Sequence, residues 1–233
     1  MAGNLPLFGA AHCAILGIVV STAVALTMIQ KRLEAGSSLL RIALGAVLVA
    51  DTILYYIHMA LHGSLSFPNH LPLELCDASL FLTILVLFTR NQLAFELAYY
   101  WGLAGATMAL LTPNLLEPFP SVGAVQFFVV HGLIVASMIY LPWSGLLRPG
   151  TRSVWRAIVG VDIFALLVGT FDAIFHSNYM YLRSKPVNAS LLDVLGPWPW
   201  YLLTTEGVAL AMFGLLYLPF WRGNAKPVEA AAD

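Results

Sequence analysis

Long apolar runs alternate with short polar breaks along nearly the whole chain. An α-helix needs roughly 20 apolar residues to cross about 30 Å of hydrocarbon. Runs of about that length fall at residues 7–29, 39–61, 71–89, 94–111, 123–142, 154–176 and 198–220. The breaks between them carry Pro, Gly, Asn or paired basic residues, which commonly end helices. The pattern predicts an all-α, polytopic membrane bundle of about seven transmembrane helices.

Composition agrees with this prediction and removes one class of function. The chain of 233 residues is 60% hydrophobic and 10% charged, whereas soluble domains carry about 25% charged residues. A formal net charge of −1 offers no basic face for nucleic acid. We expect a single transmembrane helical domain over residues 1–222 and a short disordered cytoplasmic tail over residues 223–233.

Basic side chains concentrate on one side of the predicted bundle if successive loops alternate sides. That side carries Lys31, Arg32, Arg41, Arg90, Arg148, Arg152, Arg156, Arg222 and Lys226, and the other carries Arg183 and Lys185. By the positive-inside rule the first side is cytoplasmic. We therefore expect a multi-pass protein of the cell membrane with its N-terminus outside and its C-terminus cytoplasmic.

Small residues repeat every four positions on the fourth predicted helix, at Ala98, Gly102 and Ala106. Such a row places small side chains on one helix face and is typical of close packing against a neighbouring helix.

Histidines and acidic residues gather toward the outer half of the predicted bundle. All six histidines fall there, together with Glu74, Asp77, Asp172 and Glu206. Ionisable groups at membrane depth are costly unless they face the protein interior or a watery cavity. Helical spacing sets further polar groups on shared faces. We predict a polar cavity lined by Asp51, Tyr55, His58, His62 and His176.

Both cysteines, Cys13 and Cys76, lie within predicted helices, so a disulfide is not expected. Pro72 suits a first helical turn, which would place Cys76 in about the second turn, where the helix dipole favours a thiolate. Asp77 is rotated by about 100° from the thiol. His131, at similar depth on another helix, is the best candidate base, and the pair would form a nucleophile. The alternative is that Cys76 is a small hydrophobic residue of the core.

Metal binding is a second interpretation of the polar residues. His58 and His62 could bind a divalent ion from one helix face, with His70, Glu74, Asp172 or His176 completing the shell. The intervening Glu of an HExxH motif is missing. We predict no bound metal and no cofactor.

The outer segment "HSNYMYLRSKP" supplies polar groups that could meet a phospholipid phosphate. We expect substrate contacts from Asn178, Tyr179, Arg183 and Lys185, with Glu74 and Asp77 on the facing helix.

The stretches "HLPLELCDAS", "YYWGLAGATMALLTPNL", "FFVVHGLIV", "NYMYLRSKP" and "SLLDVLGPWPWYLL" together resemble the bacterial YwaF-type integral membrane family, related to the eukaryotic transmembrane protein 164 family. The resemblance implies an acyltransferase that moves a fatty acyl chain between phospholipids through a cysteine, with a histidine as its partner. It also implies that Cys76 matches the nucleophile and that His131 matches the histidine.

The combined hypothesis is a membrane lipid acyltransferase or acyl hydrolase whose partners are membrane phospholipids, with no protein partner evident. Asp172 or Glu206 would orient the imidazole of His131. The alternative is a non-enzymatic transporter or ligand-binding protein, favoured by Asp51 near mid-bilayer and opposed by the lack of an inverted repeat. A third class is a zinc-dependent intramembrane hydrolase.

Overall fold

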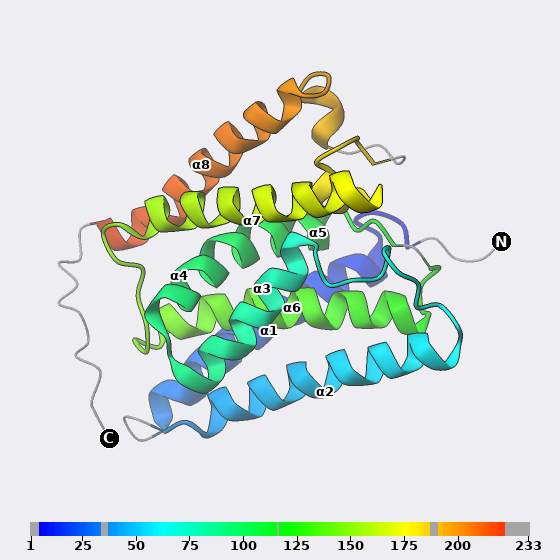
Figure 1. The fold of residues 1–233 in the computed structure, drawn as a ribbon. Helices are drawn as coiled ribbons and strands as arrows, with labels where there is room; N and C mark the ends of the chain where they lie inside the picture. Colours follow the sequence, from blue (N-terminus) through cyan, green and yellow to red (C-terminus); the bar gives the residue numbers. More distant parts are fainter. Residues whose placement is uncertain (1–4, 34–36, 116, 187–190, 222–233) are drawn as a thin grey trace.

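The computed structural model describes residues 5–33, 37–115, 117–186 and 191–221, and these residues contain helices and no strand (Figure 1). The predicted tail, residues 223–233, lies outside the described residues. The elements in chain order are α1 (Ala10–Arg32), α2 (Leu39–Leu61), α3 (Leu75–Thr89), α4 (Gln92–Trp101), the π-helical η1 (Gly102–Ala106), α5 (Thr107–Leu111), α6 (Val122–Trp143), α7 (Ser153–Phe175), the 3₁₀ turns η2 (Tyr179–Tyr181) and η3 (Leu191–Val194), and α8 (Trp200–Trp221). The all-helical prediction is confirmed.

Five of these helices, α1, α2, α6, α7 and α8, are long and apolar enough to cross a membrane. Helix α3 is apolar but has 15 residues. Elements α4, η1 and α5 follow one another without a break and together match the predicted run at residues 94–111.

Helix α3 begins at Leu75 and not at residue 71 as the sequence predicts. Glu74 has extended backbone angles and acts as the N-cap, and its side chain and that of Asp77 form a reciprocal capping box. This cap fixes the helix start three residues after Pro72. Cys76 therefore lies in the first turn of α3 and not in the second.

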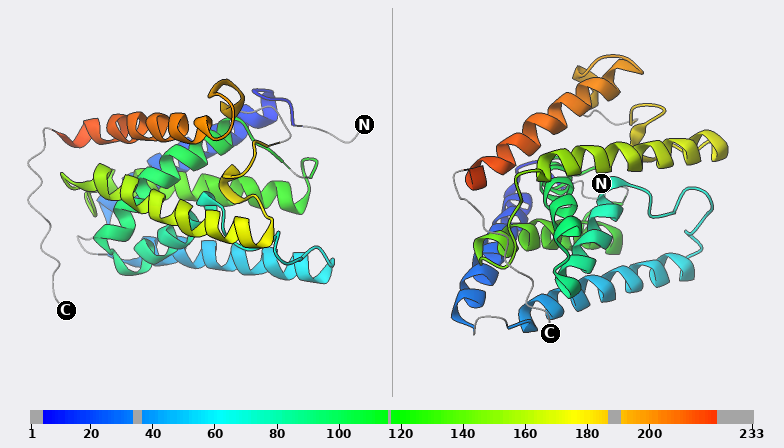
Figure 2. Two further views of the ribbon diagram at one scale, coloured as in Figure 1. Left: turned by 45° about the horizontal axis from the view of Figure 1, so that its top comes forward. Right: turned by 60° about the vertical axis from the view of Figure 1, so that its left-hand side comes forward.

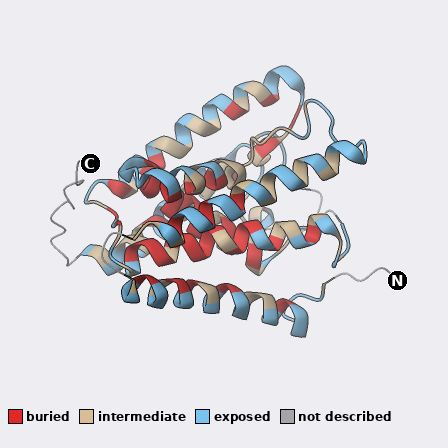
Figure 3. Cartoon of the chain, turned by 90° about the horizontal axis from the view of Figure 1, so that it is seen from below, coloured by how far each residue is buried: buried red, intermediate tan, exposed pale blue. Residues whose placement is uncertain are grey.

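Helix α6 lies at the centre of the bundle and contacts α1, α2, α3 and α4. Buried residues concentrate in the middle helices, and the outward faces of the surrounding helices are exposed (Figure 3). Helices α2 and α8 lie at opposite edges, and α8 packs beside α7 (Figure 2).

The predicted row of small residues is confirmed as a packing seam. Ala98, Gly102 and Ala106 are buried. A Cβ added to Gly102 would lie 2.7 Å from Cγ2 of Ile134, so α6 approaches η1 more closely than any side chain at residue 102 would allow. The tight contact places α6 directly against the α4–α5 run.

Hydrogen bonds show which helix ends lie together. Gln92, just after α3, donates to the carbonyl oxygen of Arg148, just after α6, at 2.8 Å. Beside them the buried Glu96 carboxylate accepts from Gly150 N at 3.0 Å and pairs with Arg156 at 2.6 Å. The C-terminal ends of α3 and α6 therefore lie on the same side of the molecule, and both helices run in the same direction.

Candidate functional site

The Cys76 thiol lies at the N-terminal end of α3, on the opposite side of the molecule from the Glu96–Arg156 pair. Its sulfur interacts with the backbone amides of residues 76 and 77 in the first helical turn. The capping box already engages the amide of Asp77, and the nearby carboxylates of Glu74 and Asp77 disfavour negative charge on the sulfur. A resting thiol at this position therefore needs a base to take its proton.

The segment after α7 is bound tightly to the start of α3. One oxygen of Glu74, Oε2, accepts from the backbone N–H of Met180 at 2.9 Å. The hydroxyl of Tyr179 donates to the carbonyl oxygen of Pro68 at 2.6 Å and accepts from the N–H of Leu71 at 2.9 Å. These bonds hold residues 177–181 against the loop that leads into α3.

Asp172, in the last turn of α7, fixes the same segment from its other side. Its Oδ1 accepts from the Ser177 hydroxyl at 2.6 Å and from the N–H of Tyr179 at 3.1 Å. Its Oδ2 is buried and has no hydrogen-bond partner among the described residues. Asp172 therefore organises the loop, and it forms no hydrogen bond with His131 in the described structure.

Further polar side chains, from α2 and from the loop after α5, interact with Asp77 and with Tyr181. Tyr55 and Tyr56 lie within electrostatic range of Asp77. The phenol of Tyr181 hydrogen-bonds to the Asn114 side chain and lies within electrostatic range of both Glu74 and Cys76. We call this group the thiol cluster; its members are Tyr55, Tyr56, Glu74, Cys76, Asp77, Asn114, Asp172, Tyr179 and Tyr181.

Glu74 is the acidic residue of the thiol cluster that lies outside the helices. Burial raises the pKa of Glu74 to about 7, and the charges of Asp77 and Asp172 add to the increase. The hydrogen bond from the Met180 amide opposes it by stabilising the carboxylate. Near neutral pH, Glu74 is thus divided between its neutral and charged forms.

His131 is buried on α6 and is oriented by its own helix. Its Nδ1 lies 2.7 Å from the carbonyl oxygen of Phe127, one turn earlier, and the ring of Phe127 lies 4.2 Å from the imidazole, centroid to centroid. Because a carbonyl oxygen can only accept, Nδ1 carries the proton, and Nε2 keeps a lone pair. Nε2 is therefore available as an acceptor, and no acidic side chain hydrogen-bonds to His131 among the described residues.

Counted along their own helices, Cys76 and His131 lie at similar distances from the C-terminal ends of α3 and α6. At 1.5 Å per residue, Cys76 lies about 20 Å before the end of α3, and His131 lies about 18 Å before the end of α6. These two ends lie together, joined through Gln92 and the loop after α6. No hydrogen bond connects Cys76 with His131 in the described part of the chain.

Glu206 lies elsewhere, on α8, where its side chain is hydrogen-bonded to Asp162 of α7. A hydrogen bond between two carboxyl groups requires a proton on one of them. The sequence analysis did not single out Asp162, because pairing between helices leaves no spacing signal within one helix.

The three predicted cavity histidines, His58, His62 and His176, are exposed or half-buried. His62 is exposed at the end of α2 and interacts with His58, through a 2.8 Å contact from Nδ1 to the backbone oxygen of His58 and a ring separation of 4.1 Å. His176 is exposed at the C-cap of α7. Among the described residues, no three His, Cys, Asp or Glu side chains lie close enough to hold a metal ion.

The Asp51 side chain hydrogen-bonds to Gln126 of α6. Gln126 lies about 6 Å along the helix axis from the start of α6. Asp51, Tyr55, Ser121 and Gln126 line a pocket of about 310 Å³. Because α2 continues for about 15 Å beyond Asp51, its last turns carry His58 and His62 past this pocket.

The predicted headgroup contacts are partly engaged within their own loop. Asn178 uses its side chain to bind the N–H groups of Arg183 and Ser184, each at 3.0 Å. The exposed Arg183 guanidinium donates to the carbonyl oxygen of Asp172 at 3.2 Å. Lys185 lies over the ring of Tyr201, 5.6 Å from its centroid.

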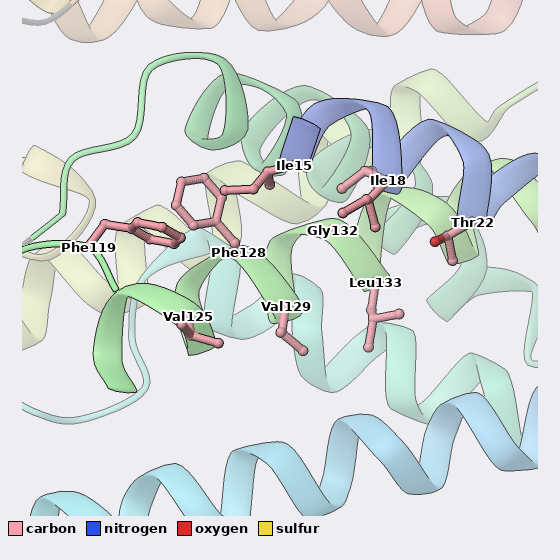
Figure 4. A pocket seen from close by; sticks show the side chains of 10 residues that line it. Ile15, Ile18, Thr22, Phe119, Val125, Phe128, Val129, Gly132 and Leu133 are labelled. Carbon is pink, nitrogen blue, oxygen red and sulfur yellow. The ribbon is translucent and has the colours of Figure 1, made fainter. Parts of the chain in front are cut away.

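A second, apolar pocket of about 330 Å³ lies between α1 and α6. Figure 4 shows its lining, which includes Ile15, Ile18, Phe128 and Val129. Close approach of the two helices forms its edge, since a Cβ on Gly132 would lie 2.8 Å from Val19. Its lining includes none of the thiol cluster.

The fold and the long apolar helices define a multi-pass helical membrane protein. The model of the TMEM164 family matches residues 7–217, and the chain belongs to this family. An uncharacterized protein of Treponema pallidum (strain Nichols) is 29% identical over 216 residues, which cover 91% of this chain and 89% of that protein. ER membrane protein complex subunit 5 of Xenopus tropicalis is 27% identical over 81 residues, 35% of this chain and 54% of that protein. No solved structure matches the chain.

Proposed function

We propose that the chain is a membrane lipid acyltransferase or acyl hydrolase of the YwaF-type branch of its family, with Cys76 as nucleophile and His131 as general base. The observation that carries this proposal is the position of Cys76, a thiol in the first turn of α3 with the polar groups of Glu74, Asp77 and Tyr181 within electrostatic range. Polar groups gathered at membrane depth mark a functional site.

The geometry of His131 supports a specific order of proton transfers. With Nδ1–H bound to Phe127, Nε2 accepts the thiol proton as sulfur attacks the carbonyl carbon of a phospholipid ester. The carbon–sulfur bond forms and the carbonyl π electrons move to oxygen. When the intermediate collapses, the ester carbon–oxygen bond breaks, and the lysolipid oxygen takes the proton from the imidazolium. The acyl-thioester then passes its acyl group to a lysolipid hydroxyl or to water by the reverse sequence.

The substrate in this proposal is a phospholipid of the cell membrane. The segment over the start of α3 carries Arg183, whose exposed guanidinium has further N–H donors for a phosphate. Tyr179, Asn178 and Lys185 shape this segment through the contacts described above, and Asp77 and Glu74 form the facing wall.

The test is covalent labelling in detergent. Purified protein is incubated with a phospholipid carrying a radiolabelled acyl chain, and hydroxylamine-sensitive label on the protein is measured. We expect label on the unmodified protein and none on Cys76→Ala. In His131→Ala the rate of labelling should fall about 10²- to 10⁴-fold, because the general base is lost.

Cys13→Ser is the matched control. Cys13 is the other cysteine of the chain, and its exposed thiol donates to the carbonyl oxygen of Phe8 at 3.3 Å on α1. This variant should label like the unmodified protein. Label retained on Cys76→Ala, or its absence from the unmodified protein, would contradict the proposal.

A ligand-binding function is the second candidate, favoured by the pocket at Asp51. One oxygen of Asp51 is buried there without a partner among the described residues. If the protein works by binding a ligand in this pocket, Asp51→Asn should abolish ligand binding, and Cys76→Ala should leave ligand binding intact. The acyl-transfer proposal predicts the opposite ranking of these two variants in the labelling assay.

A further inference from the structure

We infer that Tyr181 is a further catalytic residue, whose phenol hydroxyl donates a hydrogen bond to the oxyanion formed when Cys76 attacks an acyl ester. The inference rests on the proposed function and adds to it the group that stabilises the developing negative charge. Such donors usually contribute a large share of the catalysis of acyl transfer.

The backbone at Tyr181 is held in an uncommon conformation. Met180 has a φ of 53° and Tyr181 a φ of 55°, so two successive non-glycine residues are left-handed. Such conformations persist where the surrounding structure determines them, and they cluster at functional sites. Here the surroundings are long-range hydrogen bonds, since the Met180 N–H donates to Glu74 at 2.9 Å and the Tyr201 hydroxyl donates to the carbonyl oxygen of Tyr181.

The same bonds tie the phenol to the turn that carries the sulfur. Glu74 is the N-cap of α3 and precedes Cys76 by two residues. The carboxylate that binds Met180 thus fixes the neighbouring Tyr181 beside the first turn of α3, within electrostatic range of Cys76. The Asn114 side chain, from the loop after α5, hydrogen-bonds to the phenol and sets its direction.

Tyr181 is better placed for this role than the other polar groups of its segment. The Tyr179 hydroxyl is engaged with Pro68 and Leu71. The Asn178 side chain binds its own loop at Arg183 and Ser184. Neither group is free to turn toward the sulfur without breaking the structure that holds the segment.

The phenol also stays in the form that can donate. Burial raises the pKa of Tyr181, the carboxylate of Glu74 adds to the increase, and the Asn114 hydrogen bond opposes it. The hydroxyl is therefore protonated at neutral pH. It stabilises the oxyanion by a hydrogen bond without giving up its proton, so the transfer between Cys76, His131 and the lysolipid oxygen stays balanced.

The test compares two reactions of the same sulfur in a Cys13→Ser background. Acylation by a labelled phospholipid passes through an oxyanion, whereas alkylation by iodoacetamide displaces iodide and forms none. In Tyr181→Phe we expect the single-turnover rate of acylation to fall about 10²- to 10³-fold, with the alkylation rate of Cys76 unchanged. Tyr99→Phe, which loses a hydroxyl bonded to the Leu216 carbonyl oxygen at 3.0 Å on another part of the bundle, should change neither rate.

Each other outcome decides against one proposal. Acylation of Tyr181→Phe at the unmodified rate would remove Tyr181 from the mechanism. A parallel loss of acylation and alkylation would show that Tyr181 only keeps the site in shape, which also overturns the inference. If Tyr181→Phe does not fold, Asn114→Leu replaces it, and acylation must then fall while alkylation is retained. No acylation of the parent protein would instead refute the proposed function.

Discussion

Glu74 joins three parts of the site through one side chain. It caps α3, binds the amide of Met180 in the segment after α7, and lies two residues before the thiol. Its carboxyl is buried among acids, which raises its pKa to about 7. The protonation of this single group therefore affects how firmly the loop and the helix start are held together.

The first prediction concerns the pH dependence of stability. The folded protein binds a proton at Glu74 up to about pH 7, whereas the unfolded chain releases it near its ordinary pKa of 4.5. Stability from this group is fully present below pH 4.5 and is lost as the pH rises toward 7, by up to about 3 kcal/mol. Glu74→Gln keeps an acceptor for Met180 but cannot ionise.

Thermal unfolding in detergent at pH 5 and pH 8 checks this. The unmodified protein should lose more stability between these pH values than Glu74→Gln does. His70→Gln, which changes an exposed titratable residue in the same loop, serves as the control for other groups. Equal pH dependence in Glu74→Gln and the unmodified protein would show that Glu74 is ionised throughout this range.

Helical spacing predicted which residues share a helix face, but it did not predict which neighbouring groups that face contacts. The 4, 3, 4 spacing on α2 predicts one shared face for Asp51, Tyr55, His58 and His62. In the structure Tyr55 lies within electrostatic range of Asp77, whereas His58 is half-buried and His62 is exposed. Depth depends on the neighbouring helices, and their offsets are set by loop conformations that a single sequence does not reveal. The positive φ of Tyr181, which brings it to the cluster, has no signal in a non-glycine residue.

At the scale of elements, the π-helical turn η1 joins α4 and α5 at the tightest contact with α6. Gly102 and Gly105 both lie in this turn, but they differ in their surroundings. A Cβ on Gly102 would lie 2.7 Å from Ile134, and a Cβ on Gly105 would have no atom within 4 Å. The two glycines therefore separate the effect of packing from the effect of helix propensity.

We predict that Gly102→Ala destabilises the protein by about 1–3 kcal/mol, because Ile134 and the backbone must shift to admit the methyl group. Gly105→Ala should be neutral or should stabilise the protein by up to about 1 kcal/mol through reduced backbone entropy. Denaturant unfolding in mixed micelles measures both. Equal effects at the two positions would show that α6 does not pack against residue 102.

The hydropathy pattern predicted which segments form helices, because each predicted apolar run is helical in the structure. The observed helix ends differ from the predicted ends by a few residues. The start of α3 was harder to place because two signals compete there. Pro72 favours a helix start, but the Glu74–Asp77 capping box wins by satisfying the amides of the first turn. Asp77 at this position is an acidic variant of the usual Glu or Gln, so the motif was easily missed.

At the scale of the whole molecule, loops gather on two sides. One side holds the thiol cluster, and the other holds the Glu96–Arg156 pair and the loop after α6. Most of the basic residues fall on the second side. By the positive-inside rule we predict that the thiol cluster faces the outside of the cell membrane.

Single-cysteine variants test this orientation in intact cells, in a background without Cys13 and Cys76. A membrane-impermeant maleimide should label Ser64→Cys directly, and it should label Thr151→Cys only after the membrane is permeabilised. Both positions are exposed in the structure, so access is not limited by burial. The reverse pattern would invert the orientation while leaving the helix packing intact.

The contact between Asp162 and Glu206 has a consequence for how α7 and α8 associate. An acidic side chain on a membrane-spanning helix costs several kcal/mol unless it faces the protein interior or a watery cavity. Each of these two helices contributes one carboxyl group, and each carboxyl group finds its hydrogen-bond partner on the other helix. The pair therefore links α7 to α8 by a polar contact in addition to their apolar packing.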